Sequence, residues 1–108
     1  MLSLEYLAGL VDGEGHVALR SSNKGKYKKY YPSIQVTNTY KPIIELLQAQ
    51  YGGGIRHYVH KNHPHWKDKY DWVANGDTAR QLLTQLIPFL VIKKEAALAA
   101  LTGDQKGV

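Results

Sequence analysis

The residue best placed to do chemistry is Glu14, near the end of the segment Leu7–Gly15, which reads LAGLVDGEG. Apolar residues recur here at helical spacing, so we expect a helix from Leu4 to Gly13 with Ser3 as its N-cap. Glu14 would then lie at the C-terminal end of that helix, where a negative charge opposes the helix dipole. A residue type that opposes its local preference more often has a function, so Glu14 is our first candidate for a functional residue.

One face of this expected helix carries glycines, because Gly9 and Gly13 are four residues apart. With no side chains there, a second helix backbone can approach closely. We therefore expect a homodimer in which this helix packs on its own copy through Leu7, Gly9, Leu10 and Gly13. Two Glu14 carboxylates would then lie side by side. Paired carboxylates beside a basic surface indicate divalent-metal phosphodiester chemistry.

The rest of the chain alternates strand and helix patterns. Gly15 is expected to reverse the chain in a left-handed conformation, and the alternation from His16 to Arg20 predicts a strand. The other expected elements are a polar hairpin loop at Ser21–Lys28, strands at Lys29–Asn38, Ile55–His60 and Lys69–Asn75, a helix from Pro42 to the glycines at 52–54, and helices at Thr78–Leu86 and Lys93–Leu101. The order α-β-β-α-β-β-α plus a terminal helix predicts an α+β fold, with helices on one face of a four-stranded, mainly antiparallel sheet.

Composition limits the class of protein. The 108 residues are expected to form one domain, 1–108, and they include no cysteine, so no disulfide or cysteine-based zinc site is expected. No apolar run approaches a membrane span, and Leu7–Val11 lacks the basic region that precedes a signal peptide core, so we expect neither membrane insertion nor secretion. The cytoplasm of a prokaryote or of a phage-infected cell, or an organelle, remains open. The net charge is +5, and His16–Asn38 holds five basic residues and no acid, which indicates a polyanionic partner.

Strand alternation divides the side chains of the sheet between two faces. The apolar set is expected to face the helices: Val17, Leu19, Ile34, Val36, Ile55, Val59, Tyr70 and Trp72. The opposite face should present side chains of the types that read base edges in the major groove. We expect DNA contacts from His16, Ala18, Arg20, Ser22, Lys29, Tyr31, Ser33, Gln35, Arg56, Tyr58, His60, Asp71 and Val73, with Asn75 on the same side. A slip of one residue in the last strand would reverse its faces.

The segment Leu7–Gly15 resembles the motif of the LAGLIDADG homing endonucleases, with Val11 for the usual isoleucine and Gly13-Glu14 for Ala-Asp. Two further blocks follow in family order. Ile34–Asn38 resembles the second strand of that family, and Leu83–Lys93 resembles its last helix and the lysine-bearing turn after it. Three ordered blocks at family spacing are more specific than one short motif.

The resemblance implies a metal site. Glu14, together with Gly13, matches the position that binds the metal, and the expected cofactor is Mg²⁺ or Mn²⁺. Asp12 matches an acid that is more structural than catalytic in this family, and we interpret it so. The motif occurs once in this chain, so activity would require a homodimer.

Two more catalytic positions follow from the resemblance. Asn38 matches a polar position that organises water near the metal, although a turn residue that ends a strand is nearly as good an interpretation. Lys93 matches the active-site lysine, which stabilises the pentacovalent phosphate or polarises the attacking water. Lys94 is the alternative if the register shifts by one residue.

The function implied by the resemblance is that of an intron-encoded homing endonuclease. Such an enzyme is a site-specific, metal-dependent nuclease whose homodimer cuts double-stranded DNA at a long, nearly palindromic site. One alternative is a non-catalytic nucleic-acid-binding relative, either an intron maturase or a DNA-binding regulator, and the basic and aromatic run Tyr27–Tyr31 also suits RNA. Another alternative is that the chain is half of a longer endonuclease.

Overall fold

The computed structural model describes residues 2–24, 27–59, 62 and 67–103. Within these ranges the chain forms α1 (Leu4–Glu14), β1 (Gly15–Lys24), β2 (Tyr27–Asn38), α2 (Lys41–Tyr51), β3 (Gly54–Tyr58), β4 (Lys69–Asn75), α3 (Gly76–Leu86), a short 3₁₀ turn η1 (Ile87–Phe89) and α4 (Lys94–Thr102). No helix in the described part is long and apolar enough to cross a membrane.

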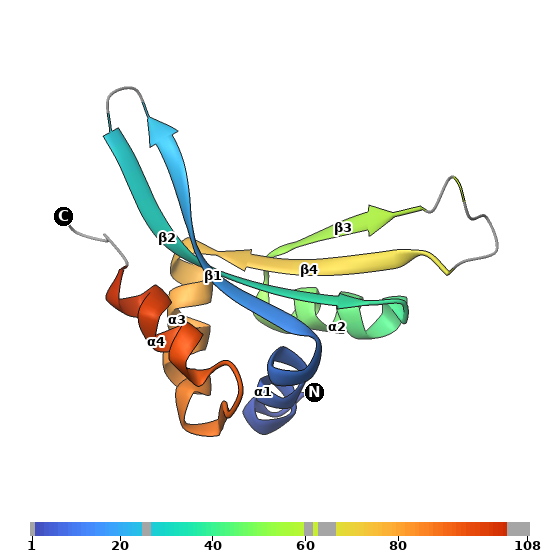
Figure 1. The fold of residues 1–108 in the computed structure, drawn as a ribbon. Coiled ribbons are helices and arrows are strands. Elements are labelled where there is room, and N and C mark those ends of the chain that lie inside the picture. Colours follow the sequence, from blue (N-terminus) through green and yellow to red (C-terminus); the bar gives the residue numbers. More distant parts are fainter. Residues whose placement is uncertain (1, 25–26, 60–61, 63–66, 104–108) are drawn as a thin grey trace.

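The strands form one antiparallel sheet in the order β1-β2-β4-β3. Figure 1 shows the four helices gathered on one side of this sheet, while the other face carries no helix. This arrangement confirms the predicted α+β fold. An uncovered sheet face can meet a ligand, whereas the covered face must be apolar.

The core lies between the sheet and the helices, where Trp72 is its largest fully buried side chain. The Trp72 indole N–H donates to the carbonyl of Gly52, 2.8 Å away, so its only polar atom is satisfied. Ile34 and Val36 of β2 lie on the same buried face, as predicted. The predicted faces of β4 are therefore confirmed, because Trp72 points into the core and its neighbour Asp71 lies on the opposite side.

The start of α1 forms as predicted, because the Ser3 hydroxyl accepts a hydrogen bond from the backbone N–H of Tyr6 at 3.1 Å. The expectation for Gly15 is wrong, since this residue has an extended backbone (φ −97°, ψ 173°) and begins β1. Glycine is needed there for space. A Cβ on Gly15 would lie 2.7 Å from both Cα and O of Val11.

The predicted loop Ser21–Lys28 is wrong over most of its length. β1 continues to Lys24 and β2 begins at Tyr27, with Ser21 opposite Tyr30 and Ser22 opposite Lys29. Figure 1 shows this ribbon projecting beyond the helices. Ser21, Ser22, Asn23 and Lys24 are all polar, so the sequence lacks the alternation that would reveal a strand there.

Other boundaries shift less. β3 ends at Tyr58 rather than His60, and His60 lies outside the described residues. Two apolar side chains predicted to face the helices are exposed, Leu19 to 38% and Val59 to 59%. Leu19 lies at the middle of β1, where its Cδ2 is beside Gly103 at the end of α4, and Val59 follows the end of β3.

Candidate active site and DNA-binding face

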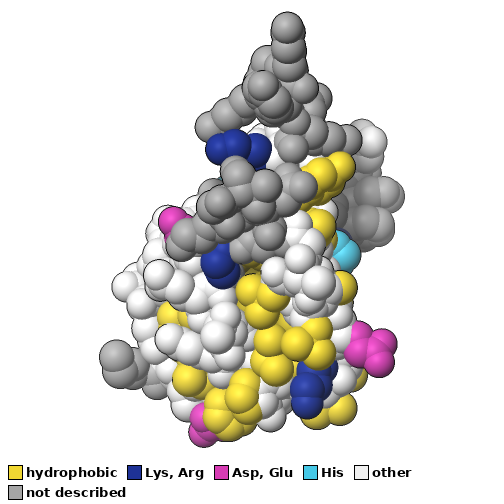
Figure 2. Space-filling model, turned by 90° about the vertical axis from the view of Figure 1, so that its left-hand side faces the viewer, with side chains coloured by type: hydrophobic (Ala, Val, Ile, Leu, Met, Phe, Trp, Pro, Cys, Tyr) yellow, Lys and Arg dark blue, Asp and Glu magenta, His cyan; other side chains and the backbone are white. Residues whose placement is uncertain are grey.

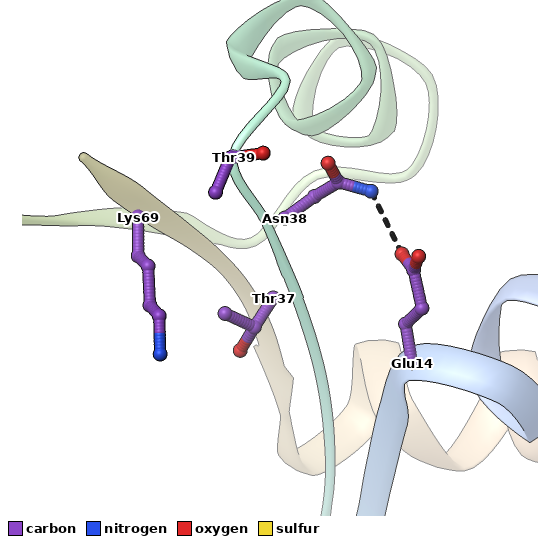
Figure 3. A pocket seen from close by; sticks show the side chains of 5 residues that line it. All are labelled: Glu14, Thr37, Asn38, Thr39 and Lys69. Carbon is purple, nitrogen blue, oxygen red and sulfur yellow. Dashed lines mark hydrogen bonds between the residues drawn. The ribbon is translucent and has the colours of Figure 1, made fainter. Parts of the chain in front are cut away.

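Glu14 and Asn38 meet where α1 and β2 both end. The Asn38 side-chain amide donates to Oε2 of Glu14 at 2.7 Å (Figure 3). The other end of that amide is also fixed, because the backbone N–H of Tyr40 donates to Asn38 Oδ1 at 2.8 Å. The Asn38 amide therefore has one orientation, and it holds an exposed carboxylate in place.

This pair lines a pocket of about 380 Å³ together with Thr37, Thr39 and Lys69 (Figure 3). Neither threonine was predicted to belong to the site, and neither was Lys69. Lys69 could have been found, because strand alternation puts it on the same side of β4 as Asp71. The sequence alone could not show that Lys69 lies near Glu14, because this depends on the pairing of β4 with the end of β2.

The carboxylate of Asp12 ties the loop before α4 to the end of α1. It accepts the backbone N–H of Val91 at 2.8 Å and that of Lys93 at 2.9 Å. Desolvation raises the pKa of Asp12, but the N–H groups of Lys93, Val91 and Ile92 and the charge of Lys93 together lower it below its ordinary value. These contacts are structural, in line with our interpretation of Asp12.

Lys93 lies beside the last turn of α1. Its ammonium donates to the carbonyl oxygen of Asp12 at 3.3 Å, which is a favourable place for a cation at a helix C-terminus. Lys93 is half-buried, whereas Lys94 is exposed and begins α4. Only Lys93 of these two has a described contact with the turn that ends in Glu14.

A buried carboxylate organises the open face of the sheet. Asp71, only 3% exposed, accepts hydrogen bonds from Gln35 Nε2 at 3.0 Å and from Thr37 Oγ1 at 2.6 Å. Arg56 Nη2 lies 3.5 Å from the same carboxylate. The carbonyl oxygen of the Gln35 amide then accepts from Arg20 at 3.4 Å and from Arg56 at 3.3 Å.

This network corrects two of the predicted DNA contacts. Ser33 is 2% exposed and its hydroxyl accepts from Nε of Arg20 at 3.1 Å, so it lies beneath the arginine. Asp71 is equally enclosed. Neither side chain reaches the surface, and both hold side chains that do. Thr37, which we had not predicted, completes the set that holds Asp71.

The other predicted contacts are distributed as follows. The exposed ones are His16, Arg20, Lys29, Arg56 and Tyr58, and the half-buried ones are Ala18, Ser22, Tyr31, Gln35 and Val73. Asn75 is exposed and precedes α3 as its N-cap residue. His60 lies outside the described residues.

The glycine face of α1 is open. A Cβ placed on Gly9 or Gly13 would meet no atom within 4 Å, and a hollow of about 390 Å³ lies along Tyr6, Gly9, Leu10, Gly13 and Glu14. The prediction that Leu7 lies at the interface is corrected by the structure. Leu7 is 0% exposed and belongs to the core of its own chain. Its position on the helix turns it towards the sheet rather than towards the hollow.

Apolar side chains also reach the surface on the side of the molecule that carries α4. Figure 2 shows hydrophobic side chains grouped on that side, and Leu19, Phe89 and Leu98 are among the exposed large apolar residues. More than half of the surface of folded proteins is commonly apolar, so we assign this group no function.

Comparison with known proteins shows the fold. No protein-family profile and no curated protein sequence matches the chain. The homing endonuclease I-CvuI, in complex with the I-CreI target in the presence of Mg, superimposes with a TM-score of 0.70 at 24% identity, over 92% of this chain and 63% of the other. The archaeal intron-encoded homing endonuclease I-Vdi141I, complexed with DNA, gives 0.63 at 18% identity, over 88% and 62%.

A third similar structure is the LAGLIDADG homing endonuclease I-GzeII in complex with its DNA target. Its TM-score is 0.62 at 12% identity, over 88% of this chain and 32% of the other. This chain therefore has the LAGLIDADG homing endonuclease fold. It spans about 63% of the length of the I-CvuI chain.

The lowered pKa of Asp12 predicts a pH-dependent contribution to stability. A carboxylate whose pKa falls on folding stabilises the protein above its unfolded pKa, near 3.8, and loses this contribution as the pH falls through the folded value. Asp12→Asn should therefore lower the free energy of unfolding by about 1–2 kcal/mol at pH 7. The difference from the parent should shrink below about pH 4, as measured by urea unfolding at several pH values.

Glu45→Gln is the matched control, because Glu45 is an exposed acid within α2 for which the structure describes no hydrogen bond or ion pair. It should leave the pH dependence unchanged. If the free energy of unfolding of Asp12→Asn stayed below that of the parent by the same amount from pH 7 to pH 3, the charge of Asp12 would not contribute to stability.

Proposed function

We propose that this chain is a site-specific, metal-dependent DNA endonuclease that works as a homodimer. The observation that carries the proposal is the position of Glu14. Its carboxylate is exposed, held by Asn38 at 2.7 Å, and located where the open glycine face of α1 meets the uncovered face of the sheet. Proteins with this fold, including I-CvuI and I-Vdi141I, have been solved with DNA.

The donor set fits a divalent cation only in part within one chain. No cluster of three or more His, Cys, Asp or Glu is found among the described residues. Mg²⁺ commonly uses one or two carboxylates, several waters and the phosphates of its substrate, so one Glu14 per chain suits such an ion. Glu14 and the carbonyl of Gly13, in the turn where helical carbonyls lack internal partners, would hold it. When bound, the metal would supply Lewis acidity and a more acidic water.

The remaining residues have roles that follow from their contacts. Asn38 fixes the rotamer of Glu14 and leaves Oε1 of the carboxylate with no described protein hydrogen bond. Lys93 uses one of its ammonium protons on Asp12, so its other protons can stabilise negative charge that develops on a phosphate. Both are proposals for catalytic residues, along with Glu14.

A homodimer would complete the site. Two α1 helices packed across their glycine faces would bring two Glu14 residues together, and a two-fold axis would pair two sheets on one duplex. A symmetric dimer reads a nearly palindromic target, because each half-site meets the same protein surface. The hollow along Gly9 and Gly13 supports this proposal, since it leaves room for another helix.

Base reading is proposed for Arg20, Gln35 and Arg56. Both ends of the Gln35 amide are engaged by protein groups, so it sets the positions of the two guanidinium groups. Arginine is the side chain that most often reads guanine in the major groove. We propose that Lys29, Tyr58 and the other exposed side chains of this face add phosphate or shape contacts.

The first test replaces the carboxylate. Glu14→Gln should reduce cleavage in Mg²⁺ by at least about 100-fold, because the amide cannot hold a divalent cation, and should leave DNA affinity in Ca²⁺ nearly unchanged. Cleaved sites would be selected from a randomised duplex library. Glu5→Gln, an acid at the opposite end of α1, is the control and should cut like the parent. Cutting by Glu14→Gln at the parental rate would remove Glu14 from the mechanism.

The second test addresses the dimer. Gly9→Leu should yield a monomer that is at least as stable as one parent chain, because its Cβ would meet no atom of the described residues within 4 Å and leucine favours a helix more than glycine. Sedimentation equilibrium would measure association, and Gln85→Leu, at an exposed position of α3, would control for added apolar surface. A parent chain that is monomeric both free and on DNA would refute the homodimer.

The third test concerns specificity. Asp71→Asn should release Gln35 and Arg56, because it places an amide donor among donors and removes the charge that faces Arg56. Preference should relax at one base pair in each half-site, by about 1–3 kcal/mol. Asp68→Asn is the control on the same hairpin, since Asp68 pairs instead with His57 at 2.8 Å. An unchanged cleavage-specificity profile for Asp71→Asn would contradict the proposed arrangement.

A further inference from the structure

Lys69 lies beside the candidate active site without taking part in the contacts described so far. It is the first residue of β4, where the register sets Tyr70 opposite Asn38 and Asp71 opposite Thr37. Its side chain lines the same pocket as Glu14. Figure 3 shows Glu14 and Lys69 on opposite sides of the last residues of β2, so the pocket extends from one to the other across the strand end.

The charge of Lys69 is not neutralised by the part of the chain that the structure describes. Its neighbours Asp68 and Asp71 are both engaged elsewhere, Asp68 with His57 and Asp71 with Gln35, Thr37 and Arg56. No described carboxylate lies within 4 Å of the Lys69 ammonium. The exposed ammonium of Lys69 is therefore available for an external anion, because Asp68 and Asp71 are paired with other side chains.

The pocket has room for that anion. Its volume of about 380 Å³ corresponds to about a dozen water molecules. Thr37 and Thr39 supply polar walls, and among the described residues Lys69 is the only cationic side chain that lines the pocket. A cation at one wall and a carboxylate at the other suit a nucleic acid backbone, in which one phosphate meets the cation while the next approaches the carboxylate with its metal.

We propose that Lys69 binds the DNA phosphate next to the scissile one and thereby positions the strand for cleavage. The proposal rests on the proposed endonuclease function and adds a positioning residue to it. Lysine acts on a phosphate as a point charge, so this contact is independent of base sequence. Lys69 would thus connect the base-reading face, on which it lies with Asp71, to the pocket that holds Glu14.

The salt dependence of DNA binding tests this contact separately from cleavage. Each phosphate neutralised contributes about −0.9 to the slope of log K against log salt concentration. In Ca²⁺, with a duplex selected from a randomised library, Lys69→Met should make the slope shallower by about 1. Lys69→Arg should restore it, because arginine keeps the charge. Lys67→Met is the matched control and should not change the slope, since Lys67 is an exposed lysine two residues earlier that does not line the pocket.

Single-turnover cleavage in Mg²⁺ adds the positioning readout. Lys69→Met should slow cleavage of bound DNA by at least about 10-fold, and Lys69→Arg should recover most of that loss. The proposal would be overturned if the slope of log K against log salt concentration kept its parental value in Lys69→Met. It would also be overturned if the slope became equally shallow in Lys67→Met.

The two proposals can fail separately. A parent chain that binds the duplex but never cuts it refutes the endonuclease, while the slope still decides whether Lys69 holds a phosphate. A parent that cuts, with a Lys69→Met variant of normal slope and rate, refutes only the role of Lys69. A parent that binds no duplex overturns both.

Discussion

The last turn of α1 is the point on which the candidate site depends. Two contacts from distant parts of the chain meet there: Asp12 accepts two N–H groups from the loop before α4, and Asn38 holds Glu14. Gly15, which directly follows Glu14, gives β1 the space to leave the helix close to Val11. Each contact joins α1 to a different element. Glu14 and Lys93 can therefore keep their places only while that turn stays intact, which makes a structural carboxylate at position 12 as necessary as the residues proposed to act on DNA.

On the open sheet face, too, buried side chains position other side chains that are exposed to solvent. Asp71 is buried and accepts hydrogen bonds from its neighbours, including the amide of Gln35. The oxygen of the same amide accepts from Arg20 and Arg56, so Gln35 positions both arginines. A buried carboxylate in a polar network is costly when it is only partly satisfied. Here no buried side-chain polar atom of the described residues lacks a partner. The arrangement gives flexible arginine side chains fixed starting positions, which reduces the entropy that they lose on contact with a ligand.

The sequence predicted the fold well where one face of an element is buried. Alternation in β4 separated Trp72 from Asp71 correctly, and the N-cap at Ser3 formed as expected. Prediction was wrong where no core imposes a pattern, as in the ribbon where β1 and β2 extend past Ser21 and Lys28. It was also wrong where a side chain has two possible neighbours. Leu7 fits both a helix partner and the core, and only the packing of α1 on the sheet places it in the core. The burial of Ser33 and Asp71 depends on arginines from other strands, which no local pattern reveals.

At the open glycines of α1, selection for stability of the single chain and selection for association with a second copy favour different residues. Within a helix each glycine costs about 1 kcal/mol relative to alanine, and no described atom of the single chain lies within 4 Å of a Cβ placed on Gly9 or Gly13. Any search for thermostable variants of the isolated chain would therefore replace them early, since a residue with a Cβ, such as alanine, strengthens the helix there and its Cβ meets no described atom within 4 Å. Such a search would raise the melting temperature while it filled the surface that we propose for a second copy. For this chain, thermal stability is then a misleading measure of fitness, and engineering should assay association and folding together.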